Sequence, residues 1–179
     1  MTEVPLINNN IPEFYSKIVK ENPSFRNFVE IGVWNGDSIT HLCQELKKLN
    51  RKFHAHAVDL WTSLMVSEEH EEAQKLSLTR FIEKIKVNEL GTNITLHQVD
   101  STMAAELFKD GYFDLIFIDA NHTYKKMKED ALAWRPKLKE GGVIAGHDYT
   151  EPSCGVKQAV DEVFGDRVLL YETIWYLNG

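Results

Sequence analysis

Five short, mostly apolar segments of this sequence each end in an acidic residue, and segments with helical spacing separate them. The acidic residues are Glu30, Asp59, Asp100, Asp119 and Asp148. Alternating strand and helix patterns predict a mostly parallel sheet with helices on both faces. The carboxyl ends of parallel strands share one edge of the sheet, where α/β proteins bind their ligands. One aspartate after a strand is commonly a helix cap or turn former, but five in succession indicate a binding edge.

The segment FVEIGVWNGDS, residues 28–38, contains the first of these strand ends. Gly32 and Gly36 follow Glu30, and glycines let the backbone approach a ligand closely. The spacing E-x-G-x-x-x-G departs from the G-x-G-x-x-G of dinucleotide sites. Because a carboxylate at Glu30 would repel a pyrophosphate, we expect a ligand with a cationic end and a ribose. Asp59, at the end of the second strand, would accept the ribose hydroxyls.

Three parts of the chain outside this core pattern are also informative. A helix is predicted to follow Asn10, with Asn10 as its cap and Pro12 as its second residue. Residues 62–90 are polar and predict one or two helices, a segment longer than a simple crossover requires and therefore lid-like. Two closing strands are expected at 168–171 and 173–177, forming a hairpin.

The bulk composition limits the class of protein. The chain has 179 residues, 43% of them hydrophobic, so we expect one domain over 1–179, with an arm and helix in 1–24. The formal net charge of −7 disfavours nonspecific binding to nucleic acid or to an anionic membrane, since both require a basic face. No window approaches the roughly 18 apolar residues of a membrane helix, and the first residues lack a basic, apolar leader.

The two cysteines, Cys43 and Cys154, suggest neither a disulfide framework nor a zinc site. Cys43 falls on the apolar face of a predicted helix, where a thiol packs as a small hydrophobic group. We therefore expect a reduced, cytoplasmic protein.

At the level of motifs, the chain resembles class I S-adenosylmethionine-dependent methyltransferases. Within them it is similar to the family that includes macrolide and aminocoumarin sugar O-methyltransferases. The motifs that carry the resemblance are FVEIGVWNGDS, the strand-end Asp59, VDS at 99–101, FDLIFIDANHTY at 113–124 and LKEGGVIAGHDY at 138–149. It covers about residues 25–177 and implies a Rossmann-like α/β fold. The implied sheet has seven strands in the order 3-2-1-4-5-7-6, the last strand antiparallel.

The resemblance also implies roles for the residues along the binding edge. The loop with Glu30, Gly32 and Gly36 would face the methionine part of S-adenosylmethionine, and Asp59 would bind its ribose. Asp100 and Ser101 would lie on the adenine side, and Asp119 would border the cofactor. Trp61 has two interpretations of equal weight, stacking on the adenine or packing as a buried aromatic.

A second cluster would activate the methyl acceptor. In metal-dependent relatives the matching positions bind magnesium, which here implies Asp119, His147 and Asp148 as ligands. His122 would be the general base, with Asp119 counted as catalytic beside it. An alcohol is a poor nucleophile until its proton leaves, so a divalent cation and a histidine would both help. Magnesium prefers oxygen ligands, so His147 suits manganese, iron or zinc at least as well. Alternatively, His147 supports a metal ligand or faces the substrate, and only the two aspartates are ligands.

We therefore expect an O-methyltransferase that acts on a hydroxyl of a sugar or another small molecule. The alternative is a noncatalytic domain that keeps the cofactor fold for binding or scaffolding. A nucleic-acid methyltransferase is disfavoured by the charge. Because the chain is short, three arrangements of the acceptor site stay open. The acceptor site is exposed to solvent, it accepts a large or polymeric substrate, or a second subunit of a homo-oligomer completes it.

Overall fold

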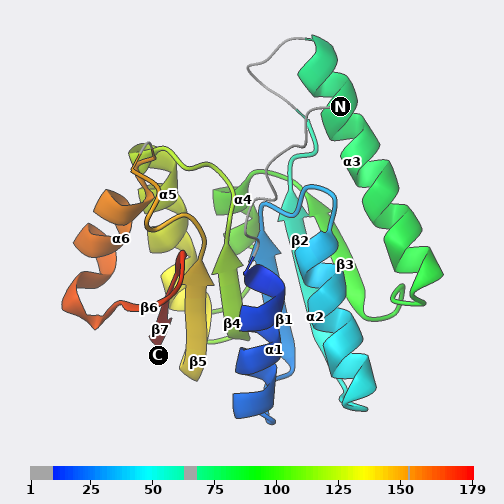
Figure 1. Ribbon diagram of the computed structural model, residues 1–179, viewed down its shortest axis with the longest axis horizontal. Coiled ribbons are helices and arrows are strands. Elements are labelled where there is room, and N and C mark those ends of the chain that lie inside the picture. The colour runs from blue at the N-terminus through cyan, green and yellow to red at the C-terminus, as the bar shows by residue number, and fades with distance from the viewer. Residues whose placement is uncertain (1–9, 63–67, 153) are drawn as a thin grey trace.

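The computed structural model describes residues 10–62, 68–152 and 154–179, without the side chains of 68–75. Its centre is a seven-stranded sheet with the order β3-β2-β1-β4-β5-β7-β6 (Figure 1). The strands are β1 (Asn27–Ile31), β2 (His54–Asp59), β3 (Ile94–Gln98), β4 (Phe113–Ile118), β5 (Leu138–Gly146), β6 (Leu169–Tyr171) and β7 (Ile174–Asn178). The pairs from β3 through β5 are parallel, and β7 is antiparallel to both of its neighbours. The predicted strand order and the reversed last strand are confirmed.

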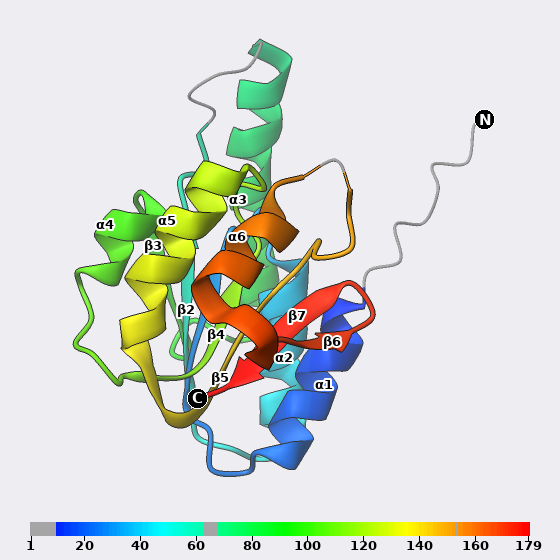
Figure 2. The ribbon, with the colours of Figure 1, turned by 90° about the vertical axis from the view of Figure 1, so that its left-hand side faces the viewer.

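Helices cover both faces of the sheet (Figures 1 and 2). One face carries α1 (Ile11–Glu21), α2 (Asp37–Lys48) and α3 (Glu68–Val87). The other face carries α4 (Ser101–Ala105), α5 (Tyr124–Trp134) and α6 (Val156–Phe164). Short 3₁₀ turns at Arg135–Lys137 and Gly165–Arg167 follow α5 and α6. Each face has its own apolar core, because every strand of a parallel sheet is buried on both sides.

The central strand β1 is the point where the chain changes direction across the sheet. It pairs with β2 on one side and with β4 on the other. The connections therefore diverge from the carboxyl end of β1, and open α/β sheets bind ligands in the crevice at such a point. The backbone ties this end to both neighbours: Gly32 N donates to Val58 O at 2.9 Å, and Asp119 N donates to Ile31 O at 2.8 Å.

The helix α3 occupies most of the 62–90 segment that the sequence marked as lid-like, and residues 63–67 lie outside the described part. It is one helix, which settles the choice between one and two. Its Phe81 is buried, and Lys84 Nζ donates to Asn35 O at 3.0 Å and to Asp37 Oδ1 at 2.6 Å. Its last turns thus dock on the glycine loop, while its first turns extend past the strand ends (Figure 1). A lid movement stays a prediction.

Two local expectations were wrong. Glu30 is the fourth residue of β1 and lies inside the strand, because Ile31 continues the parallel pairing with Val58 and Ile118. Asn10 stands at the N-cap position of α1, and Pro12 is the second helical residue as predicted. The Asn10 side chain does not cap the helix. It instead donates hydrogen bonds to the turn between β6 and β7.

Among the described residues, none of the helices combines the length and the apolar character that crossing a bilayer requires. Cys43 and Cys154 are both free thiols, as expected. Cys43 is fully buried in the core of α2, and burial raises its pKa.

Candidate functional site

The buried carboxyl of Glu30 joins two helices to the first strand. Tyr15 Oη of α1 donates to Glu30 Oε2 at 2.6 Å, and Ser38 Oγ of α2 donates to Glu30 Oε1 at 2.5 Å. Burial raises the pKa of Glu30 to about 8, although both hydrogen bonds favour the charged form. Each carboxyl oxygen thus accepts a hydrogen bond from another side chain of the protein. The predicted contact of Glu30 with the cofactor stays a prediction.

The glycines of the loop are needed for packing. Gly32 has φ +84°, and a β-carbon there would lie 2.2 Å from the backbone oxygen of Asp119. Gly36 has φ +73°, and a β-carbon there would lie 1.9 Å from the Phe81 ring. Only glycine therefore lets this loop lie against the end of β4 and beneath α3.

Asp59 connects the loop after β1 to the loop after β2. Its Oδ2 accepts from Trp34 N at 2.8 Å, and its Oδ1 accepts from Trp61 N at 2.8 Å. Both tryptophans have left-handed backbones, with φ values of 48° and 46°, which is strained for a bulky residue. The Asp59 carboxylate is only half-buried, so it keeps acceptor capacity for hydroxyls at the crevice.

The two tryptophans differ in exposure. Trp61 is 1% exposed and stacks on Phe81 with ring centroids 6.0 Å apart, while its Nε1 donates to Trp34 O at 2.9 Å. Trp34 is 60% exposed. The burial of Trp61 favours the packing interpretation over adenine stacking. Sequence reasoning missed Trp34, although its place between the two glycines was a usable signal.

Asp100 and Ser101 lie at the start of α4, beyond the end of β3. Asp100 is the N-cap, and its Oδ1 accepts from Thr102 N at 3.0 Å and from Thr102 Oγ1 at 2.7 Å. The hydrogen bond from Thr102 is the main reason that the pKa of Asp100 is lowered. Ser101 Oγ accepts from Trp134 Nε1 at 2.8 Å. The predicted place of Asp100 and Ser101 on the adenine side of the cofactor stays a prediction.

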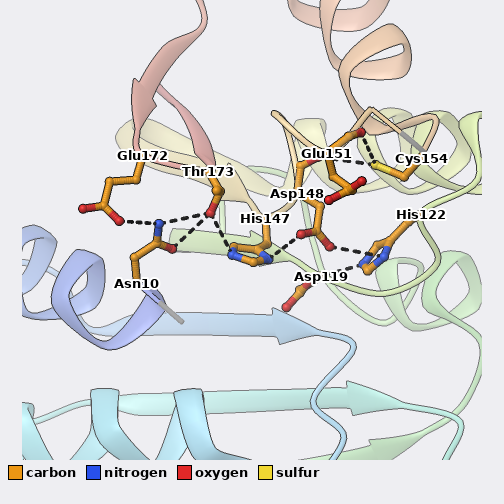
Figure 3. Close-up of polar contacts among 9 residues, drawn as sticks. All are labelled: Asn10, Asp119, His122, His147, Asp148, Glu151, Cys154, Glu172 and Thr173. Carbon is orange, nitrogen blue, oxygen red and sulfur yellow. Dashed lines mark hydrogen bonds and ion pairs between the residues drawn. The ribbon is translucent and has the colours of Figure 1, made fainter. Parts of the chain in front are cut away.

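A second cluster lies across the end of β4 (Figure 3). His122 Nε2 lies 3.2 Å from Asp119 Oδ1, and His122 Nδ1 lies 3.3 Å from Asp148 Oδ2. The imidazole is therefore held between two carboxylates that follow β4 and β5. The hydrogen bond with Asp119 is the largest cause of the raised pKa of His122, and the charges of both aspartates add to it against burial.

His147 faces the opposite side of Asp148. Its Nδ1 lies 3.0 Å from Asp148 Oδ1, and its Nε2 lies 2.9 Å from Thr173 Oγ1. Burial lowers the pKa of His147, but the hydrogen bond and charge of Asp148 outweigh burial, so the net shift is upward. The pKa of Asp148 is lowered, chiefly by its hydrogen bond with His147. Both ring nitrogens of His147 are occupied.

The backbone of Asp148 is fixed from both sides. Asp148 has φ 58°, a strained conformation for a residue with a side chain. His147 N donates to Ile118 O at 3.3 Å, and Tyr149 N donates to Thr173 O at 3.0 Å. Strain of this kind persists where the surroundings impose it, which is common at functional sites.

The donor atoms suit a divalent cation in part. One ligand atom each from Asp119, His122 and Asp148 lie within 4.8 Å of one another. Two carboxylates and one imidazole match manganese or iron better than magnesium, which prefers oxygen throughout. Within the described residues, His147 does not belong to this set, because its Nδ1 and Nε2 face Asp148 and Thr173. The geometry thus favours the interpretation in which His147 supports a ligand.

Sequence reasoning missed the partners that hold these groups. Tyr15 and Ser38 hold Glu30, and Thr173 and Asn10 hold His147. No local pattern pointed to them, since Thr173 follows a predicted turn and Asn10 looks like an ordinary helix cap.

Comparison with known proteins gives one matching family and many solved structures that share the same fold. Residues 29–149 match the family model described as a methyltransferase domain. Among solved structures, the O-methyltransferase NovP superposes with a TM-score of 0.69 at 17% identity, covering 94% of this chain and 77% of that one. CalS11, a calicheamicin methyltransferase, gives 0.69 at 15% identity, with 93% and 76% covered. An O-methyltransferase from Bacillus cereus gives 0.65 at 16% identity, with 97% and 82% covered. No curated protein matches significantly.

Proposed function

From the premise that this chain belongs to the methyltransferase domain family, we propose that it transfers a methyl group from S-adenosylmethionine to a hydroxyl of a sugar or another small molecule. The observation that carries the proposal is the Asp119, His122 and Asp148 cluster beside the glycine loop (Figure 3). A histidine oriented by a carboxylate next to a cofactor crevice is the arrangement that deprotonation of an acceptor requires.

The methyl donor would bind on the β1 side of the crevice. The Asp59 carboxylate lies at the carboxyl end of β2 and retains acceptor capacity for two ribose hydroxyls. The solved O-methyltransferase from Bacillus cereus is in complex with SAH, the product form of that cofactor. Trp34, whose side chain is exposed, donates its backbone N–H to the same carboxylate.

His122 would be the general base. Asp148 Oδ2 lies 3.3 Å from His122 Nδ1 and would keep a proton there, while Nε2, now 3.2 Å from Asp119 Oδ1, would take the proton of the acceptor when the acceptor hydroxyl replaces that contact. Its raised pKa makes His122 a stronger base than an isolated imidazole. General bases of this kind contribute typically about 10²–10⁴ in rate. The side chain is 43% exposed, so an acceptor can reach it from solvent.

A divalent ion is compatible with the same cluster. Asp119 and Asp148 would hold it, and when bound it would lower the pKa of the acceptor hydroxyl. His147 would act only by holding Asp148.

The acceptor class rests on the described substrate of one structural neighbour. CalS11 is described as a TDP-rhamnose 3′-O-methyltransferase in its apo structure, a second solved structure that superposes on this chain with a TM-score of 0.62. NovP is likewise an O-methyltransferase. A nucleotide sugar or glycosylated small molecule is therefore the first acceptor to try.

The test combines binding and turnover. Calorimetry should detect S-adenosylhomocysteine at micromolar to millimolar concentration, and labelled S-adenosylmethionine should methylate members of a panel of nucleotide sugars and glycosides. If the protein binds the cofactor but methylates a protein or a nucleic acid, the proposed acceptor class is wrong and the proposed methyl transfer still holds. No cofactor binding at millimolar ligand would overturn the proposal as a whole.

A further inference from the structure

His147 is held by two residues from opposite ends of the chain (Figure 3). Thr173 Oγ1 lies 2.9 Å from His147 Nε2, and Asn10 Nδ2 donates to Thr173 Oγ1 at 3.0 Å and to Glu172 Oε2 at 2.9 Å. Asn10 is 6% exposed, so these bonds are largely shielded from water.

The direction of these hydrogen bonds fixes where the proton of His147 lies. Both amide protons of Asn10 are used, one toward Glu172 and one toward Thr173. The hydroxyl proton of Thr173 then has two acceptors, His147 Nε2 at 2.9 Å and Asn10 Oδ1 at 3.3 Å. A carboxylate only accepts, so His147 Nδ1, 3.0 Å from Asp148 Oδ1, carries a proton, and Nε2 of the neutral imidazole accepts from Thr173.

The arrangement tolerates a second proton without changing the Asp148 contact. A doubly protonated His147 would donate from Nε2 to Thr173, whose hydroxyl would turn to Asn10 Oδ1. In both cases an N–H on Nδ1 faces Asp148.

The position of Asn10 supports a specific role. Asparagine is a strong helix N-cap and usually bonds the first turn, with about 1 kcal/mol of stabilisation. Here the side chain gives up that bond and spans 163 residues of sequence to reach Thr173. Departures of this kind from local preference are expected at functional sites.

We propose that Asn10 and Thr173 are positioning residues that hold the His147 ring against Asp148, so that Asp148 keeps one oxygen on His147 Nδ1 and turns the other toward His122. The contacts run in one line, from Asn10 through Thr173, His147 and Asp148 to His122. The consequence for catalysis rests on the proposed methyl transfer, whereas the placement of His147 and Asp148 does not.

The decisive measurement is the set of ring resonances of His147 and His122 in long-range ¹H–¹⁵N spectra, recorded at one pH for all variants. The wild-type protein should show a proton on Nδ1 of His147, facing Asp148. Thr173→Val keeps the shape of the side chain but removes the hydroxyl, so the ring resonances of His147 should shift, and those of His122 should shift with them because Asp148 lies between the two rings. Thr173→Ser should restore the wild-type spectrum. An Nδ1 without a proton in the wild type, or unchanged His122 resonances in Thr173→Val, overturns the proposal.

The chain offers a matched control for the loss of one hydroxyl. Thr95 Oγ1 lies 2.8 Å from His54 Nε2 at the β2–β3 edge, so Thr95→Val removes an equivalent bond elsewhere. This variant should leave the His147 spectrum unchanged.

Turnover adds a second readout. In Thr173→Val, kcat should fall about 10- to 100-fold, as it does when partners of site residues are removed, with an unchanged KM for S-adenosylmethionine. Thr173→Ser should recover it. Equal losses in Thr173→Ser, or a parallel loss of cofactor affinity, would show a merely structural role and overturn the positioning role. Failure of the wild type to bind cofactor would instead reject the proposed function and leave the result from the histidine resonances standing.

Discussion

Gly32 lies so close to the backbone of Asp119 that no β-carbon would fit between the two halves of the candidate site. A β-carbon on Gly32 would lie 2.2 Å from the backbone oxygen of Asp119, 2.5 Å from its carbonyl carbon and 2.6 Å from Ala120 Cα. The loop that is expected to hold the methyl donor thus lies directly on the residue that begins the second cluster. Proximity of donor and acceptor groups is the main requirement of a transfer reaction.

Gly32→Ala is therefore expected to destabilise the fold and weaken cofactor binding. The left-handed backbone costs about 1–3 kcal/mol for a residue with a side chain, and displacing the end of β4 adds to it. Gly111→Ala is the control, since Gly111 has φ +65° but a β-carbon there would meet no atom within 4 Å. Urea unfolding should show a clearly larger loss for Gly32→Ala. Equal losses would contradict the steric part of the explanation.

His122→Ala should reduce methyl transfer by about 10²–10⁴ while S-adenosylhomocysteine affinity stays within a few-fold of the wild type. The reason is that His122 contacts the two aspartates and not the glycine loop. Radiometric turnover and calorimetry measure the two effects. His41→Ala, which alters a histidine bonded to Ser16 between α1 and α2, is the control. Unchanged turnover in His122→Ala would remove His122 from the mechanism.

Mn²⁺ binding distinguishes whether His122 is a metal ligand or the general base. Asp119→Asn and Asp148→Asn are each expected to weaken binding of the ion at least tenfold, because each removes a carboxylate oxygen from the cluster. His122→Ala should weaken it much less if His122 acts as the base. Titration by electron paramagnetic resonance measures free Mn²⁺ directly. A loss in His122→Ala as large as in the aspartate variants would make His122 a ligand.

Glu30 is expected to make the stability of the protein fall as the pH rises from about 4.5 to about 8. Its pKa is about 8 in the folded protein against 4.5 in the unfolded chain, so the folded state binds the extra proton. The resulting stabilisation is complete below about pH 4.5 and is lost as the pH rises through about 8. Glu30→Gln keeps a similar shape without a titrating group. Urea midpoints between about pH 6.5 and 8 should fall for the wild type and stay level for Glu30→Gln.

His56 is expected to make the stability of the protein fall as the pH decreases. Burial is the main cause that lowers its pKa from 6.5 to about 3, and its Nε2 has no hydrogen-bond partner. The unfolded chain therefore takes up a proton that the folded protein refuses. Stability should be unaffected by His56 above about pH 6.5 and should fall as the pH drops from there toward 3.

A His56→Phe variant, placed among the rings of Phe108 and Phe113, should show a shallower acid slope than the wild type. Thermal melting from pH 7 down to pH 4 measures the difference. Parallel slopes in the two proteins would mean that other groups control acid unfolding.

Much of the fold followed from short sequence patterns. The apolar segment that ends at Asp119 and the helix predicted after Asn10 correspond to β4 and α1, because apolar runs and helix starts are local properties of the sequence. The strand order and the reversed β7 were implied by the family resemblance and confirmed. The aspartates at the ends of β2 and β4 lie where the sequence placed them, since the end of an apolar run also marks the end of a strand.

The chemistry of individual side chains was decided by tertiary packing. The sequence showed a carboxylate at Glu30, but only burial between Tyr15 and Ser38 raised its pKa. The sequence likewise put His147 beside Asp148, and only the approach of Thr173 and Asn10 placed its ring between Thr173 and Asp148 and outside the metal-ligand set. Local sequence determines periodicity and strand ends, whereas side-chain direction and charge depend on neighbours that come from distant parts of the chain. The two helices around Glu30 and the two chain ends around His147 meet only when the sheet has formed.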